Sequence, residues 1–193
     1  MTDTIKYSLG ALALLLLLFL YNRNSQQSYK MDSQKIFEKP NEDVYKIKLS
    51  ENDKEIELVR MDSTWSISKV DSLVIKQNQV DKIFDRLLTV EKEILITTKE
   101  EKWEKFGVDD SLGRHIQVFD KNNNKLLHYV FGNSGQDWQH NYMRENNTSD
   151  VYRSNDNVFF LLNTNTTYWG QKPPEPAPER NLKNIEKDSI PGT

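Results

Sequence analysis

The stretch V-Y-K-I-K-L-S-E-N-D-K-E-I-E-L-V-R-M-D-S-T-W-S-I-S, residues 44–68, decides the fold. Apolar and polar side chains alternate along it in three short runs, which the turn-rich triplets E-N-D and M-D-S separate. A period of two is typical of a strand with one buried face, and short turns join such strands as antiparallel neighbours. The stretch therefore predicts a meander of three antiparallel strands.

The pattern then changes from a period of two to a helical period. Five apolar residues fall on one face of a helix predicted over residues 79–90, and they are Val80, Ile83, Phe84, Leu87 and Leu88. Five further strands are predicted over 93–98, 114–120, 125–131, 142–145 and 150–154, with short helices at 100–106 and 158–162. This order predicts an α+β fold, in which helices pack on a mainly antiparallel sheet.

An uncharged run, Y-S-L-G-A-L-A-L-L-L-L-L-F-L-Y, precedes this domain at residues 7–21. Its 15 residues would cover about 22 Å as a helix, against a hydrocarbon core of about 30 Å. That length fits an amino-terminal transmembrane helix or a cleaved signal peptide. The following N-R-N-S-Q-Q-S lacks the small residues of a cleavage site, so we expect an uncleaved anchor that contacts the lipid bilayer through residues 5–21.

Composition divides the rest of the chain. We expect a polar linker over residues 22–43, one globular domain over 44–170 and a proline-rich disordered tail over 171–193. Lys6 and the amino-terminal amine stand against Arg23 and Lys30 on the other side of the anchor, so charge leaves its orientation open. The size of the polar chain after the anchor favours a single-pass protein with an extracytoplasmic carboxy-terminal domain.

Charge and cysteine content narrow the classes of function. The 26 basic and 29 acidic residues are interspersed and give a net charge of −3, so nucleic acid is not an expected partner. The sequence has no cysteine, which excludes a disulfide scaffold and a thiolate zinc site.

Motifs that would indicate catalysis or cofactor binding are weak. His115, His128 and His140 do not stand in a metal-binding spacing, and the serines lie outside any G-x-S-x-G motif. We therefore expect no enzymatic activity, no cofactor and no metal site, and an enzyme with a dispersed site is the remaining catalytic alternative.

The loop N-S-G-Q-D-W-Q-H-N, residues 133–141, is the most promising contact surface. Trp138 offers an apolar plate, and Asp137, Gln139 and His140 beside it supply polar groups. Such a combination suits a glycan or a protein partner. The alternative is that Trp138 folds back and covers an open edge of the sheet.

Four short pieces together resemble a known family. They are F-G-V-D-D at 106–110, R-H-I-Q-V at 114–118, V-F-G at 130–132 and Y-M-R at 142–144, and with them the chain resembles the DUF4340 family of bacterial membrane-anchored envelope proteins. Many members have proline where Ser111 stands and leucine where Val108 stands. The family has no assigned activity, so the resemblance assigns no functional residue, but it implies a periplasmic domain. Members are often associated with ABC-type transport components of the gliding-motility kind.

The leading hypothesis is a membrane-anchored, non-catalytic accessory or interaction domain of the bacterial envelope, associated with such a transport system. The alternative is a glycan- or small-ligand-binding envelope domain that uses Trp138 and its neighbours.

Overall fold

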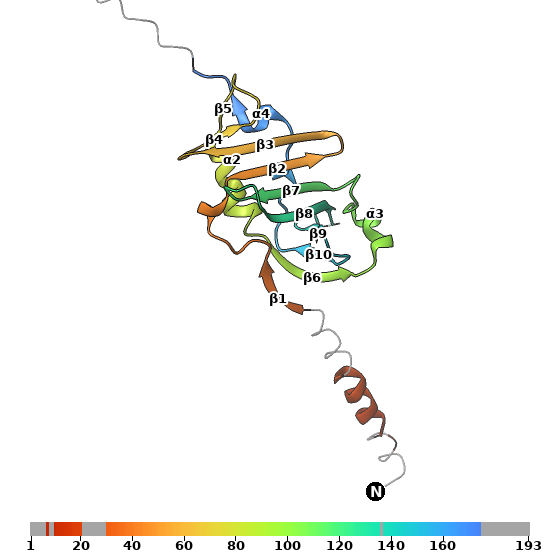
Figure 1. The fold of residues 1–193 in the computed structure, drawn as a ribbon. Coiled ribbons are helices and arrows are strands. Elements are labelled where there is room, and N and C mark those ends of the chain that lie inside the picture. The colour runs from red at the N-terminus through yellow and green to blue at the C-terminus, as the bar shows by residue number, and fades with distance from the viewer. Residues whose placement is uncertain (1–6, 8–9, 21–29, 136, 175–193) are drawn as a thin grey trace, which may run out of the picture.

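The computed structural model describes residue 7 and residues 10–20, 30–135 and 137–174 (Figure 1). Residues 10–20 are helical, and each of them is exposed. Among the residues that the structure describes, no helix is long and apolar enough to cross a membrane. Much of the anchor expected at residues 5–21 is described, but residues 5, 6, 8, 9 and 21 lie outside the described part.

A nine-stranded sheet in which every neighbouring pair is antiparallel forms the domain, in the order β1-β6-β10-β9-β8-β7-β2-β3-β4. A second sheet pairs the short strands β5 (Val74–Ile75) and β11 (Gly170–Gln171). The nine strands are β1 (Lys30–Lys35), β2 (Lys46–Glu51), β3 (Lys54–Met61), β4 (Thr64–Ile67), β6 (Glu91–Thr97), β7 (Arg114–Phe119), β8 (Lys125–Ser134), β9 (Asn141–Glu145) and β10 (Val151–Ser154).

The predicted meander is confirmed as β2, β3 and β4. Ile47 pairs with Leu58 across β2 and β3, so the apolar residues of both strands share one face. The turns between these strands place Asn52 and Asp62 at positive φ (52° each). Asn and Asp tolerate this backbone region better than most residues, which explains why E-N-D and M-D-S can close such short turns.

The second half of the sheet is a separate meander beside the first. Strand β7 pairs with β2, and β8, β9 and β10 follow in order until β10 meets β6. Strand β6 thus lies on the far side of the sheet from β4, although the two are close in sequence. The chain between them forms the helical layer.

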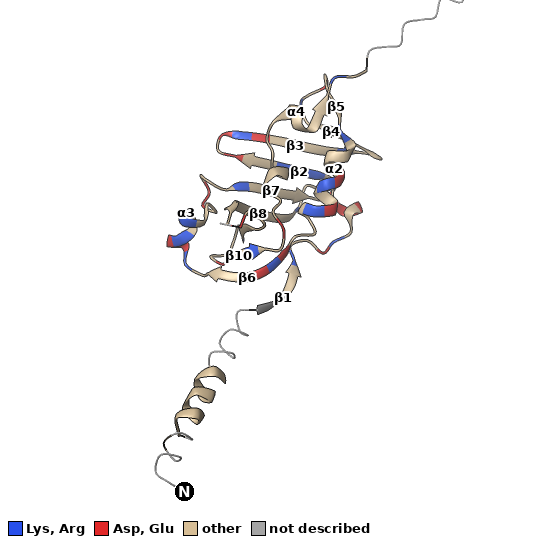
Figure 2. Cartoon of the chain, turned by 180° about the vertical axis from the view of Figure 1, so that it is seen from behind, with Lys and Arg blue, Asp and Glu red and all other residues tan. Residues whose placement is uncertain are grey.

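The expected helix at 79–90 lies over one face of the sheet, as Figures 1 and 2 show from opposite sides. It consists of α2 (Gln77–Lys82) and a π-helical turn, η2 (Ile83–Leu87), in which the Leu88 N–H donates to the Ile83 carbonyl at 2.8 Å. Its buried residues join the inward-facing residues of the strands in the main core. These buried residues are Val80, Ile83, Leu87 and Leu88.

Several shorter helices complete the domain. Of those expected, one is η3 (Glu100–Lys102) with α3 (Trp103–Phe106), and the other is η4 (Phe159–Leu161). The sequence did not indicate η1 (Asn41–Asp43) and α4 (Thr166–Trp169). Helix α3 covers the opposite face of the sheet, where it packs on a second, smaller core cluster of Val108, Val130 and Val151.

The expected polar linker at residues 22–43 is wrong over its second half. Residues 30–35 form β1, an edge strand paired with β6, and Ile36 and Phe37 after it are buried in the main core. An edge strand is held by backbone hydrogen bonds and commonly carries polar side chains, so its sequence K-M-D-S-Q-K resembled a spacer. The folded domain therefore begins by residue 30 and not at 44. At the other end, β11 continues it to Gln171, and residues 175–193 of the expected disordered tail lie outside the described residues.

Candidate functional site

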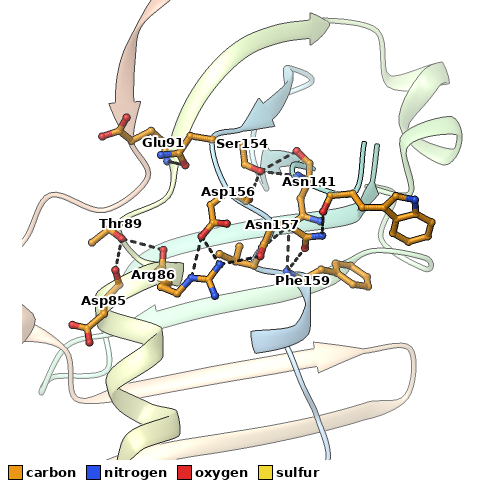
Figure 3. Close-up of polar contacts among 12 residues, drawn as sticks. Asp85, Arg86, Thr89, Glu91, Asn141, Ser154, Asp156, Asn157 and Phe159 are labelled. Atoms are coloured by element: carbon orange, nitrogen blue, oxygen red, sulfur yellow. Dashed lines mark hydrogen bonds and ion pairs between the residues drawn. The ribbon is translucent and has the colours of Figure 1, made fainter. Parts of the chain in front are cut away.

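The loop that carries the predicted contact residues joins β8 to β9, and both strands lie inside the sheet. Ser134 pairs with Asn141 at the base of this hairpin. Asn141 is fully buried, and its side-chain Oδ1 accepts hydrogen bonds from the backbone N–H groups of Val158 (2.8 Å) and Phe159 (3.2 Å) (Figure 3). Its own N–H donates to the Ser154 hydroxyl at 2.8 Å. A buried polar network that is satisfied in this way fixes the base of the loop.

A second set of contacts ties the same region to the helical layer. Arg86, at the end of η2, forms an ion pair with Asp156 at 2.6 Å (Figure 3). Asn157, the next residue, donates from Nδ2 to the Trp138 carbonyl at 2.9 Å. Residues from η2, from the segment after β10 and from the β8–β9 loop therefore meet at one end of the sheet.

Trp138 projects into solvent. Its side chain is 78% exposed and its φ is +58°, so it does not cover an edge of the sheet. The alternative interpretation, in which Trp138 covers an open edge, is therefore contradicted in the part of the chain that the structure describes, because β8 and β9, which carry the loop, each have a neighbouring strand on both sides. Gln139 is also exposed, and its N–H donates to Asp137 Oδ1 at 3.1 Å.

The other two predicted residues, Asp137 and His140, line a cavity of about 330 Å³. The His140 Nδ1 lies 2.8 Å from the Ser154 carbonyl and therefore donates to it, so in the neutral ring Nε2 is an acceptor. This Nε2 lies 3.5 Å from Asp137 Oδ2. The structure thus brings together Asp137 and His140, with Trp138 on the same short loop.

Sequence reasoning missed the rest of the cavity wall. Tyr142 of β9 and Arg153 of β10 line it, and Arg153 forms an ion pair with Glu93 of β6 at 2.9 Å. Tyr142 belongs to the motif Y-M-R. Arg153 lies on β10, which pairs with β9 on one side and with β6 on the other, and β6 is far from both in sequence. Only the pairing of β6, β10 and β9 could have placed these three side chains beside the loop.

The cavity offers hydrogen-bond donors and acceptors at short range. Arg153 and Tyr142 can donate, Asp137 can accept, and His140 can do either according to its charge. This set suits a ligand with several hydroxyl or amide groups. Among the described residues, no group of three His, Asp or Glu side chains is arranged to hold a metal ion.

The pieces that carry the family resemblance meet on the same face of the sheet as the cavity, where Phe106 packs against Tyr142 with their ring centres 4.7 Å apart. Gly107 ends α3 with φ +63°, a conformation that favours glycine. Gly132 lies so close to this turn that an added Cβ would be 2.0 Å from the Phe106 carbonyl oxygen. The turn itself is held by Asp109, whose Oδ1 accepts from the N–H groups of Ser111 and Leu112 at 2.9 and 3.0 Å.

Arg144 of Y-M-R closes this assembly, which we call the Arg144 latch. Its side chain is 1% exposed, its Nε donates to the Val108 carbonyl at 2.6 Å, and its guanidinium forms an ion pair with Asp110. The guanidinium carbon also lies 3.8 Å from the centre of the Trp103 ring. These contacts make the shared motifs a structural support that joins α3 and its following turn to the sheet.

The two remaining histidines lie next to the latch. His115 Nδ1 is 3.2 Å from His128 Nε2, and the other ring nitrogen of His115 is 3.2 Å from the Asp110 carbonyl. Burial, together with the nearby charge of Lys125, lowers the pKa of His128 to about 4. His128 is therefore neutral near pH 7, which fits a structural role on β8.

The fold defines an α+β protein with a mainly antiparallel nine-stranded sheet and short helices. The family described as "Domain of unknown function (DUF4340)" matches residues 65–191, and the chain belongs to this family. The match begins in β4 and includes all the motifs of the Arg144 latch. No curated protein and no solved structure matches the chain.

Proposed function

We propose that the protein is a membrane-anchored, non-catalytic accessory domain of the bacterial envelope, which faces the periplasm and works with an ABC-type transport system. The observation that carries the proposal is the helix of residues 10–20. All its residues are apolar or glycine, and its large side chains are exposed, as in Leu14 (61%), Leu17 (66%) and Phe19 (62%). A contiguous apolar surface of this kind is unfavourable in water. A bilayer has the chemistry that such a surface requires.

The proposed association with a transport system rests on the family resemblance and not on the anchor. Members of the family are often associated with transport components of the gliding-motility kind. The exposed Trp138 on a firmly held loop adds a surface that could contact such a component, because tryptophan is enriched among residues that dominate binding energies.

The anchor is tested by comparing the full chain with a variant that carries Leu15→Lys and Leu17→Lys. We expect the full chain to stay with membranes after a carbonate wash and the variant to be released, because a charged residue at the centre of a span costs about 2.5–3.5 kcal/mol. Mass spectrometry should find residues 1–21 in the mature protein. An amino terminus between residues 22 and 28 would contradict the anchor and favour a cleaved signal.

Orientation is tested with protease added to spheroplasts. We expect the carboxy-terminal domain to be digested, because the proposal places it in the periplasm. Protection of the domain would place it in the cytoplasm.

A glycan- or small-ligand-binding function is the second candidate, and the cavity beside Trp138 favours it. An exposed aromatic plate next to several donors and acceptors is the usual arrangement in a site that binds a sugar ring. The cavity is lined in part by Asp137, His140 and Arg153. In this case the ligand would contact Trp138 through its ring face and the cavity through its hydroxyl groups.

One pair of variants separates the two candidates. Trp138→Ala with His140→Ala should leave the fold intact, because one side chain is largely exposed and the other would lose one hydrogen bond. Met61→Ala is the matched control, since Met61 is 62% exposed at the distant β3–β4 turn. Loss of a transporter permease or ATPase from pull-downs with the double variant alone supports the accessory function. Loss of binding to purified envelope polysaccharide supports the second candidate, and retention of every partner and ligand would remove Trp138 and His140 from the proposal.

A further inference from the structure

A second cavity, of about 370 Å³, lies between the segment after β1 and one face of the sheet. Residues 34–39 form one wall. The opposite wall comes from Lys92 of β6, from Leu126, Leu127 and Tyr129 of β8, and from Glu145 of β9. Its volume lies within the range of about 300–1,000 Å³ that small-molecule sites occupy. The cavity is separate from the one beside Trp138, and no residue lines both.

Lys92 is the charged group at the base of this cavity. Its side chain is only 13% exposed, and its Nζ lies 5.2 Å from the centre of the Tyr152 ring and 5.5 Å from that of Tyr129. The ring faces attract the ammonium group and hold it in place. The ammonium is therefore fixed in position and largely removed from bulk water.

The charges around the cavity leave an excess of one positive charge. Three amines line it, those of Lys35, Lys39 and Lys92, against two carboxylates, those of Glu38 and Glu145. The Glu145 Oε2 lies 4.0 Å from the Lys92 Nζ, which is longer than a hydrogen bond. The ammonium therefore keeps donor capacity for a second anionic group.

The remaining wall is apolar. Phe37, Leu127 and Tyr129 belong to the main core and are between 4% and 8% exposed, and the cavity borders them. A small inorganic ion would leave this apolar wall in contact with water. An anion that carries an alkyl or aromatic group would cover the part of this wall that remains exposed, which is favourable because it removes apolar surface from water.

We propose that this cavity, which we call the Lys92 cavity, binds an anionic amphiphile: a single phosphate or carboxylate attached to an apolar chain. The anionic group contacts Lys92, with Lys35 and Lys39 at the rim, and the apolar chain lies against Phe37 and Leu127. The ligand is either a free molecule or the headgroup region of an anionic lipid. The lipid source rests on the proposed anchor, since ten peptide units connect residue 20 to β1 and limit their separation to about 35 Å.

The test uses the full-length chain in phosphatidylcholine nanodiscs and hexyl phosphate as the probe, measured by isothermal titration calorimetry. We expect wild type to bind hexyl phosphate, and Lys92→Met to bind it at least tenfold more weakly. Methionine keeps an unbranched chain between the two tyrosine rings while it removes the charge. Lys92→Arg should restore most of the affinity, and Lys54→Gln, which removes an exposed lysine at the distant β2–β3 turn, should bind like wild type.

Two comparisons define the ligand. Inorganic phosphate should bind at least tenfold more weakly than hexyl phosphate, and hexyltrimethylammonium should not bind.

The lipid composition of the discs tests the source of the ligand. Discs that contain phosphatidylglycerol should weaken the apparent affinity for hexyl phosphate if the lipid headgroup occupies the cavity, and should leave it unchanged if the natural ligand is a free molecule. If Lys92→Met does not fold, the double variant Lys35→Gln with Lys39→Gln takes its place, with an expected loss of about fivefold.

Equal affinity in wild type and Lys92→Met, or the absence of binding by wild type, would overturn the proposal. Equal binding of inorganic phosphate and hexyl phosphate would overturn the role of the apolar wall. Failure of the chain to insert into the discs would contradict the proposed anchor and not the proposed ligand site. The same titration with the chain in solution would then test whether the Lys92 cavity binds hexyl phosphate.

Discussion

Replacement of Arg144 by methionine tests whether the family motifs act as a structural support. Arg144 donates to the Val108 and Asn146 carbonyls at 2.6 and 3.1 Å, forms an ion pair with Asp110 and lies over the Trp103 ring. Methionine keeps the apolar part of the side chain but removes all four interactions. The variant therefore isolates the guanidinium group.

The size of the effect follows from what each partner loses. The Val108 carbonyl would be left without this donor in a buried position, which costs about 1–3 kcal/mol, and loss of the contact with the Trp103 ring costs about 0.5–2 kcal/mol. Asp110 is 76% exposed, so water replaces the guanidinium there at little cost. The desolvation free energy of the buried Arg144 guanidinium no longer applies in the methionine variant, and this offsets part of the destabilisation. We expect a net destabilisation of about 2–4 kcal/mol.

The assay is urea unfolding of a fragment of residues 30–174, followed by circular dichroism. Asp110→Asn is the matched control, with an expected cost below about 1 kcal/mol because its carboxylate is solvated. A cost below 1 kcal/mol for Arg144→Met would refute the reasoning. So would an equal cost for both variants, since it would mean that the exposed ion pair, and not the buried guanidinium, holds the turn.

Three further outcomes are expected. Leu87→Ala should destabilise the domain by about 2–5 kcal/mol in urea unfolding, because Leu87 is fully buried between η2 and the sheet; a loss below 1 kcal/mol would contradict this packing. The fragment of residues 30–174 should be more stable than that of residues 44–174 by about 3–5 kcal/mol, because the shorter fragment lacks β1 and the buried side chains of Ile36 and Phe37. Equal midpoints of urea unfolding for the two fragments would mean that the folded domain begins at residue 44. The stability contributed by neutral His128 should be lost as the pH falls from about 6.5, where the unfolded chain begins to take up a proton, towards the folded pKa of about 4; His128→Gln should flatten this dependence, and an unchanged slope would show that other groups cause it.

The sequence predicted the fold where the signal is local. Alternation of apolar and polar residues predicted β2, β3 and β4, and the spacing of Val80, Ile83 and Leu87 predicted the helix and its buried face. The position of β6 could not be predicted, because its partners β1 and β10 lie more than 50 residues away in sequence on either side and periodicity carries no information on such pairings. Strand β1 was missed for a related reason. It is held to β6 by backbone hydrogen bonds, which do not require an alternating pattern of apolar side chains.

The same limit applies to the candidate site. Trp138 stood out because a large aromatic residue in a polar loop needs an explanation, and Asp137 and His140 were found as its neighbours. Arg153 and Glu93 gave no such signal, because charged residues on a strand usually face water. Their ion pair at the cavity exists because β10 pairs with β6, a contact that joins residues 60 positions apart.

The arrangement of the β8–β9 hairpin relates the family motifs to the candidate site. Its two strands carry V-F-G and Y-M-R, so both strands are fixed through the Arg144 latch and through the close approach of Gly132 to Phe106. The loop that these strands carry is further held by buried Asn141. A rigid base lowers the entropy that a binding loop must lose when it contacts a partner. A mutation in the latch should therefore weaken binding through Trp138 as well as stability, although the two residues do not touch, and Arg144→Met at a temperature where the domain remains folded would show whether this coupling exists.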